Sequence, residues 1–188
     1  MKIAVIDNYD SFVNNIIHYL EAYHHISIEV MKNDEINWKV LDSCDRILLS
    51  PGPGIPSEAG DLMKVIQKYY FKKSILGVCL GHQAIGEFFG CRLKNLDYPL
   101  HGISSNLKIF TNDNIFKNIS SNTEVGHYHS WVIDSSFVSD AIEVLATDDY
   151  GHIMAIKHRE YPIYGVQFHP ESVLTTEGRK MIENWVNE

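Results

Sequence analysis

Four short apolar runs, separated by segments with helical spacing of apolar residues, occupy the first half of the chain. Each run is almost continuously apolar, as expected for a strand that is buried on both faces of a sheet. The runs are residues 2–6, 26–31, 46–49 and 74–78. Because strands that alternate with helices form parallel sheets, this half of the chain predicts an α/β fold with helices on both faces.

Three helices are expected after these strands. The first covers residues 12–20, with Asp10 before it as a candidate N-cap. The second covers Ser57–Tyr70 and uses Ser57 as its N-cap, and the third covers Gln83–Phe89.

The second half of the chain is rich in residues that favour strands. Segments near 91–94, 101–110, 127–134, 141–147, 153–158 and 162–168 predict further strands, some of them antiparallel. A final helix is expected over Thr175–Val186. Since no repeat or linker divides the chain, we expect one domain over residues 1–188. Its predicted architecture has three layers, with helices on both faces of a mixed, mostly parallel sheet.

Charge and cysteine content argue against several classes of function. The net charge is −8 and no basic run stands out, whereas a nucleic-acid surface needs a Lys/Arg stripe. The three cysteines form no CxxC pair, so neither a disulfide framework nor a zinc site is expected. We also expect no other metal and no cofactor. Without a signal-like or membrane-spanning run, the sequence predicts a cytoplasmic protein with free thiols and no membrane partner.

Cys79 is the strongest candidate for catalysis, because it lies where a predicted strand meets a predicted helix. The glycines on either side, Gly77 and Gly81, permit a tight turn that lifts the side chain clear of the sheet. The N-terminus of the following helix favours the thiolate, which is the reactive form. The backbone N–H of Leu80 points to where a tetrahedral oxyanion would develop. The alternative is that Cys79 is a buried structural cysteine.

His169 is the candidate base for this thiol. Pro170 follows it and disfavours a helical conformation, and in an extended chain residues two apart point to the same side. His169 and Glu171 can therefore lie on one face, where the carboxylate orients the imidazole. The alternative is that this segment only ends a strand.

The segment Ser50–Gly54 (SPGPG) follows the third predicted strand. Its prolines hold the backbone and its glycines allow close approach, so the Gly52 N–H can complete an oxyanion hole with Leu80. Alternatively, the segment is only a turn. His127 and His129 form an HxH pair on a predicted strand; because no third ligand is evident, we expect them to serve in the core or behind the site rather than to bind metal.

Together these segments resemble the class I, or triad, glutamine amidotransferases. The matching segments are Asp7–Phe12 (DNYDSF), Ser50–Gly54 (SPGPG), Gly77–Gln83 (GVCLGHQ), Tyr128–Ser130 (YHS) and Gly165–Ser172 (GVQFHPES). Each motif alone is modest, but all of them in this order form a specific signature. The resemblance is greatest to the small subunit of anthranilate synthase, component II, with the glutaminase subunit of aminodeoxychorismate synthase as a close relative. The expected fold is flavodoxin-like.

The resemblance implies a substrate and roles for individual residues. The substrate would be L-glutamine, with Cys79 as nucleophile, His169 as base and Glu171 as the group that holds His169. Gly52 and Leu80 would donate to the oxyanion. The residues implied to contact glutamine are Gly52, Pro53, Gly54, Leu80, Gln83, Ser130 and Trp131.

The resemblance also implies a partner. A chain of 188 residues leaves no room for a chorismate-binding domain, so we expect a separate large synthase subunit that receives ammonia. Three positions depart from the usual family pattern, namely Ile103, His127 and Trp131. The first two bear on the surface that meets this partner, and Trp131 would contact glutamine only through its backbone. The motifs do not separate tryptophan biosynthesis from folate biosynthesis, or from a subunit shared by both.

Two functions of other classes stay open from the residues alone. A stand-alone thiol hydrolase suits the turn at Cys79, although the order Cys–His–Glu differs from the nucleophile–acid–base order of α/β-hydrolases. A catalytically silent binding module is the other, since such folds host many functions.

Overall fold

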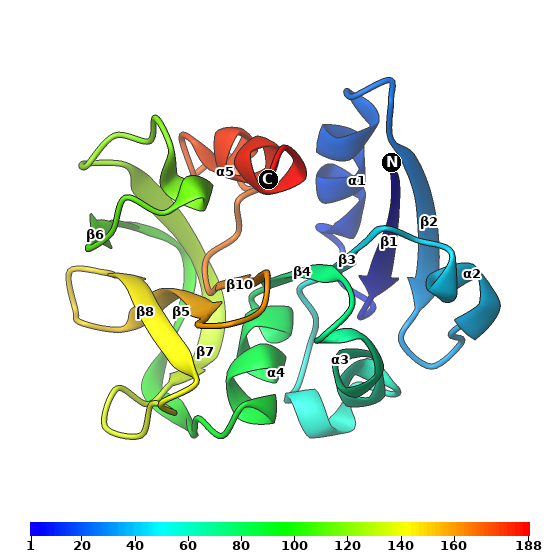
Figure 1. The fold of residues 1–188 in the computed structure, drawn as a ribbon. Helices are drawn as coiled ribbons and strands as arrows, with labels where there is room; N and C mark the ends of the chain where they lie inside the picture. The colour runs from blue at the N-terminus through cyan, green and yellow to red at the C-terminus, as the bar shows by residue number, and fades with distance from the viewer.

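An eight-stranded sheet lies between two layers of helices in the structure, a computed structural model that describes residues 1–188 (Figure 1). The strand order is β2-β1-β3-β4-β10-β9-β8-β6. The parallel strands are β1 (Lys2–Asp7), β2 (Ser27–Lys32), β3 (Arg46–Leu49), β4 (Ser74–Val78) and β10 (Ile163–Val166). The antiparallel strands are β9 (Ile153–His158), β8 (Ile142–Thr147) and β6 (Lys108–Ile109). The predicted mixed, mostly parallel sheet is confirmed.

Helices cover both faces of this sheet, as the alternation of the first half predicts (Figure 1). One layer holds α1 (Val13–Glu21) and α5 (Gly178–Val186), and the other holds α3 (Leu62–Tyr69) and α4 (Leu80–Phe88). Residues 3–6 of β1 are all apolar because Ile3 and Val5 pack into the first layer, whereas Ala4 and Ile6 pack into the second. None of the helices is both long and apolar enough to cross a membrane.

A separate two-stranded antiparallel sheet forms one side of the molecule (Figure 1). It consists of β5 (Leu93–Asn106) and β7 (Glu124–Ile133), so the two strands predicted near 91–94 and 101–110 are largely one long strand. Strand β7 lies against α4 at Gly86, where an added Cβ would collide with the Ile133 side chain. This contact ties the second sheet to the helix that follows Cys79.

The predicted helix over Ser57–Tyr70 is wrong in its first turns. Pro56–Glu58 forms a short 3₁₀ helix, and α3 begins only at Leu62, after Asp61. The interruption comes from Gly60, whose φ of +54° lies in the left-handed region and cannot continue a helix. Ser57 is therefore not an N-cap.

Two other helix starts differ from the prediction, two short elements are additional, and one predicted cap is wrong. Helix α4 begins at Leu80 rather than Gln83, because the Cys79 carbonyl already accepts the Gln83 N–H at 3.0 Å. Helix α5 begins at Gly178 rather than Thr175. The short helix α2 (Trp38–Asp42) was not predicted, and the 3₁₀ turn η2 (Asn114–Phe116) was also missed. Asp10 accepts the Phe12 N–H before α1 but is not its N-cap residue.

Candidate active site

Cys79 occupies a strained turn between β4 and α4. Its φ of 51° and ψ of −100° place a non-glycine residue in a conformation that costs about 1–3 kcal/mol. The surrounding backbone holds it there, since the Cys79 N–H donates to the Val166 carbonyl of β10 at 2.8 Å. Such strain at a thiol between a strand and a helix is the geometry expected of a nucleophile elbow.

The glycines beside Cys79 are required by close packing. A Cβ on Gly77 would collide with the backbone of Gly81 and would lie 2.7 Å from the His82 nitrogen. A Cβ on Gly81 would collide with the Leu49 carbonyl of β3. Only glycine therefore lets α4 start this close to the sheet, and this closeness brings the first turn of α4 directly under the thiol.

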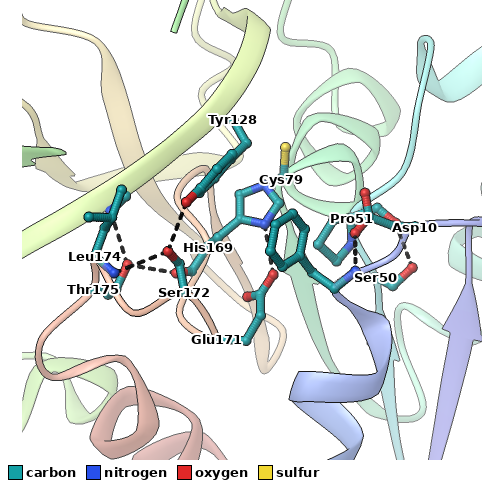
Figure 2. Close-up of polar contacts among 12 residues, drawn as sticks. Asp10, Ser50, Pro51, Cys79, Tyr128, His169, Glu171, Ser172, Leu174 and Thr175 are labelled. Atoms are coloured by element: carbon teal, nitrogen blue, oxygen red, sulfur yellow. Dashed lines mark hydrogen bonds and ion pairs between the residues drawn. The ribbon is translucent and has the colours of Figure 1, made fainter. Parts of the chain in front are cut away.

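His169 and Glu171 meet as predicted, but across a turn rather than an extended segment, because the Ser172 N–H donates to the His169 carbonyl at 3.1 Å (Figure 2). The His169 Nδ1 and Glu171 Oε1 atoms lie 2.7 Å apart, and both side chains are almost fully buried. Figure 2 shows His169 between Cys79 and Glu171. The other ring nitrogen, Nε2, is buried and makes no hydrogen bond within the protein. A neutral ring that donates through Nδ1 presents Nε2 as an acceptor, which is the role of a general base.

The surroundings of His169 favour its charged form. Burial by itself lowers the pKa of the imidazole, but interactions with the side chains of Cys79 and then Glu171 outweigh burial. Together they raise the pKa of His169 from 6.5 to about 10. An imidazolium of this kind stabilises a thiolate beside it.

Several contacts fix the ring of His169. Its backbone N–H donates to the Gly126 carbonyl at 3.1 Å, and its carbonyl accepts the Thr175 hydroxyl at 2.6 Å (Figure 2). The Phe12 and Tyr128 rings contact the imidazole edge-on, with centroids 5.6 and 5.1 Å away. The base therefore has little rotational freedom, as a preorganised catalytic group requires.

A cavity of about 200 Å³ opens beside Cys79. Drug-sized ligands occupy roughly 300–1,000 Å³, so this cavity suits a ligand of amino-acid size. It is lined by these residues from the predicted set: Gly52, Pro53, Gly54, Cys79, Gln83, Ser130 and Trp131. Leu80 does not line it but adjoins it, since a Cβ on Gly52 would lie 2.7 Å from Leu80 Cδ2.

Sequence reasoning missed one wall of this cavity. The additional lining residues are Pro99, Leu100, His101, Tyr128 and His129. Tyr128 and His129 belong to the YHS motif and had a sequence signal, although neither was assigned to the site. Pro99 and Leu100 had none, because they reach the site through an irregularity in β5, where the register with β7 shifts between Asn95 and Leu100.

Gln83 approaches the cavity with its amide already oriented. Its Nε2 donates to the Trp131 carbonyl at 2.9 Å and to Gln167 Oε1 at 3.2 Å. Since an amide nitrogen has two hydrogens, both are engaged, and Gln83 offers a ligand only its Oε1 acceptor. Trp131 contributes its backbone carbonyl to this network.

The family model for Glutamine amidotransferase class-I matches residues 4–188. The chain belongs to this family. It is therefore a glutamine amidotransferase, and its fold is that of the class I members.

Relatives of this amidotransferase agree with that membership. The chain is 43% identical to anthranilate synthase component 2 of Saccharolobus solfataricus, over 97% of this chain and 96% of that protein. It is 42% identical to the bifunctional protein TrpGD of Thermotoga maritima, of which it spans only 32%. A solved structure from Thermoplasma acidophilum, assigned to GMP synthase, has a TM-score of 0.88 at 28% identity, covering 100% of this chain and 92% of that one.

His129 lines the cavity of this amidotransferase, and His127 lies behind it. Because His127 is fully buried, the prediction that it bears on the surface that meets a partner is wrong. His127 Nε2 lies 2.7 Å from Ser105 Oγ, and its Nδ1 lies 3.1 Å from His129 Nε2. Burial lowers the pKa of both rings, that of His129 to about 3, so they stay neutral at physiological pH. No group of three or more His, Cys, Asp or Glu side chains is placed to hold a metal ion.

Proposed function

We propose that this chain is the glutaminase subunit of an anthranilate synthase, which hydrolyses L-glutamine and passes ammonia to a separate chorismate-using subunit. The proposal rests above all on one arrangement: Cys79 lines a small cavity beside a His169 that is hydrogen-bonded to Glu171. Full-length similarity to anthranilate synthase component 2 directs this chemistry to tryptophan biosynthesis. We place the reaction in the cytoplasm.

The reaction proceeds through a thioester. His169 already holds the proton taken from the Cys79 thiol when Cys79 Sγ attacks the carboxamide carbon of glutamine. The C–N bond then breaks, His169 gives this proton to the leaving ammonia, and a γ-glutamyl thioester stays on Cys79. His169 next takes a proton from water, which attacks the thioester and releases glutamate. Glu171 keeps Nδ1 protonated so that Nε2 can serve in each proton transfer.

The cavity residues bind the rest of the substrate. The Gly52 and Leu80 N–H groups stabilise the oxyanion that forms on the carboxamide oxygen. Gln83 Oε1 accepts a hydrogen bond from the substrate, because its two amide hydrogens are engaged elsewhere. The other groups that contact glutamine are Pro53, Gly54, Ser130 and the backbone of Trp131.

The large subunit completes the enzyme. Ammonia that escaped to water would be lost to protonation, so a shielded path into the chorismate site is required. We expect slow glutamine hydrolysis by the isolated chain and faster hydrolysis once the large subunit docks. Equal rates with and without the partner would refute this coupling.

The test combines the chain with purified large subunits of anthranilate synthase and of aminodeoxychorismate synthase from the same organism. With chorismate and glutamine, we expect anthranilate and glutamate in equal amounts, and neither product from glutamine with Cys79→Ala. Aminodeoxychorismate alone would move the function to folate biosynthesis, and both products would indicate a shared subunit. Turnover of simple esters with no glutamine hydrolysis would favour a stand-alone thiol hydrolase instead.

A further inference from the structure

Gln167 is a fully buried polar residue between β10 and His169 to which the reaction above gives no role. Its Nε2 donates to Cys79 Sγ at 3.6 Å, within the range of N–H···S hydrogen bonds. Its backbone N–H donates to the Met154 carbonyl of β9 at 2.8 Å, which fixes the residue on the sheet. A buried amide that donates to the nucleophile has a larger effect there than in water.

The amide of Gln167 is held in one orientation. Gln83 Nε2 donates to Gln167 Oε1 at 3.2 Å, so the carbonyl end is already an acceptor and the NH₂ end faces the sulfur. Gln83 is in turn anchored on the Trp131 carbonyl of β7 at 2.9 Å. A chain of donors thus runs from Gln83 through Gln167 to Cys79, and reversing the Gln167 amide would break two of its bonds.

A donor of this kind distinguishes the two forms of the thiol. A hydrogen bond to a charged acceptor is about twice as strong as one to a neutral acceptor, so an N–H aimed at sulfur favours the thiolate. It also restrains the side chain of a residue whose backbone is strained. We propose that Gln167 is a positioning residue that holds Cys79 Sγ through its N–H and favours the thiolate, with Gln83 holding Gln167. This inference rests on the proposed role of Cys79 as nucleophile.

Alkylation by iodoacetamide tests this without glutamine, because the reagent reacts with the thiolate. The rate at Cys79 is followed across pH by mass spectrometry after digestion with chymotrypsin, whose cleavage after Phe88 or Phe89 separates Cys79 from Cys91. In Gln167→Met, which keeps the length but lacks the donor, we expect the midpoint of the pH profile to rise by about one unit or more. At pH values below both midpoints, the alkylation rate should then be about tenfold lower in the variant.

Matched variants separate the hydrogen bond from packing. Gln167→Glu keeps the shape but places a carboxylate near the sulfur, so the midpoint should rise further than in Gln167→Met. Gln67→Met, at an exposed position of α3, should leave the midpoint unchanged. A purely structural role would lower the unfolding temperature of the Gln167 variants without moving the midpoint.

An unchanged midpoint in folded Gln167→Met overturns the proposal. If that variant does not fold, Gln83→Met applies the same test by releasing the Gln167 amide, and an unchanged midpoint there overturns it equally. Failure of glutamine hydrolysis in the wild-type assembly would refute the proposed function, but the pH profile of Cys79 alkylation could still be measured. The two failures are therefore distinguishable.

Discussion

His82 makes the stability of this protein sensitive to acid. The side chain lies on α4, three residues after Cys79, and is fully buried against Gly165 of β10. Burial lowers the pKa of His82 from 6.5 to about 4, and the Gly165 backbone only partly offsets this effect. Because the unfolded chain binds this proton near pH 6.5 and the folded chain only near pH 4, His82 stabilises the fold above pH 6.5. That contribution is lost as the pH falls through 4.

The magnitude follows from the separation of the two pKa values. At about 1.4 kcal/mol per pH unit, the interval from 6.5 to about 4 corresponds to about 3 kcal/mol of unfolding free energy. About 2 kcal/mol of this is lost between pH 7 and pH 5. Since small domains have only about 5–15 kcal/mol in total, this loss is large enough to measure.

Urea unfolding at pH 7 and pH 5 tests this reasoning in the wild type and in His82→Leu. The variant has no proton to bind at this position, so its unfolding free energy should fall by about 2 kcal/mol less than that of the wild type. His24→Gln, an exposed change, should keep the wild-type pH dependence. If His82→Leu loses as much stability as the wild type between these pH values, the argument from burial is wrong.

Other perturbations probe the site and its packing. Glu171→Gln should lower kcat for glutamine about 10²- to 10⁴-fold, because the amide no longer holds Nδ1–H for the base. The control Glu87→Gln, on the exposed side of α4, should retain activity. Steady-state kinetics of the assembled enzyme measure both variants. Cys79→Ala should lower the pKa of His169 below about 10, since the largest attraction that opposes burial is removed, and an unchanged ¹⁵N NMR titration would contradict this. Gly81→Ala should destabilise the fold by about 1–3 kcal/mol despite alanine's better helix propensity, because its Cβ would collide with the Leu49 carbonyl. Equal or greater stability in urea unfolding would show that β3 moves to accommodate the Cβ.

The strands of the first half were predictable because both faces of the sheet are covered. Continuous apolar runs such as the one in β1 arise when alternate residues pack into opposite helical layers. The helix at Ser57 was mispredicted because of a contact between residues far apart in the sequence. Apolar spacing continues through Gly60, but the left-handed conformation of that glycine is set by its contact with Asn33, which the spacing cannot reveal.

The second sheet was recognised only in part. Residues of β5 are mostly exposed, so they carry little hydrophobic pattern, and their pairing with β7 includes two register shifts. The wall of the cavity that Pro99 and Leu100 form depends on the first of these shifts. Nothing near them in the chain indicates this position.

The sequence by itself determined the features that depend on neighbouring residues. The strand–helix turn at Cys79 needs the glycines beside it, and the contact between His169 and Glu171 needs only a short turn across Pro170, closed by the Ser172 N–H on the His169 carbonyl. Tertiary structure alone decided what surrounds the sulfur. Gln167 reaches Cys79 across 88 positions of sequence and Gln83 across 84, because β10 pairs beside β4 at the edge where α4 begins. Contacts across such separations follow from strand order, which local patterns do not encode.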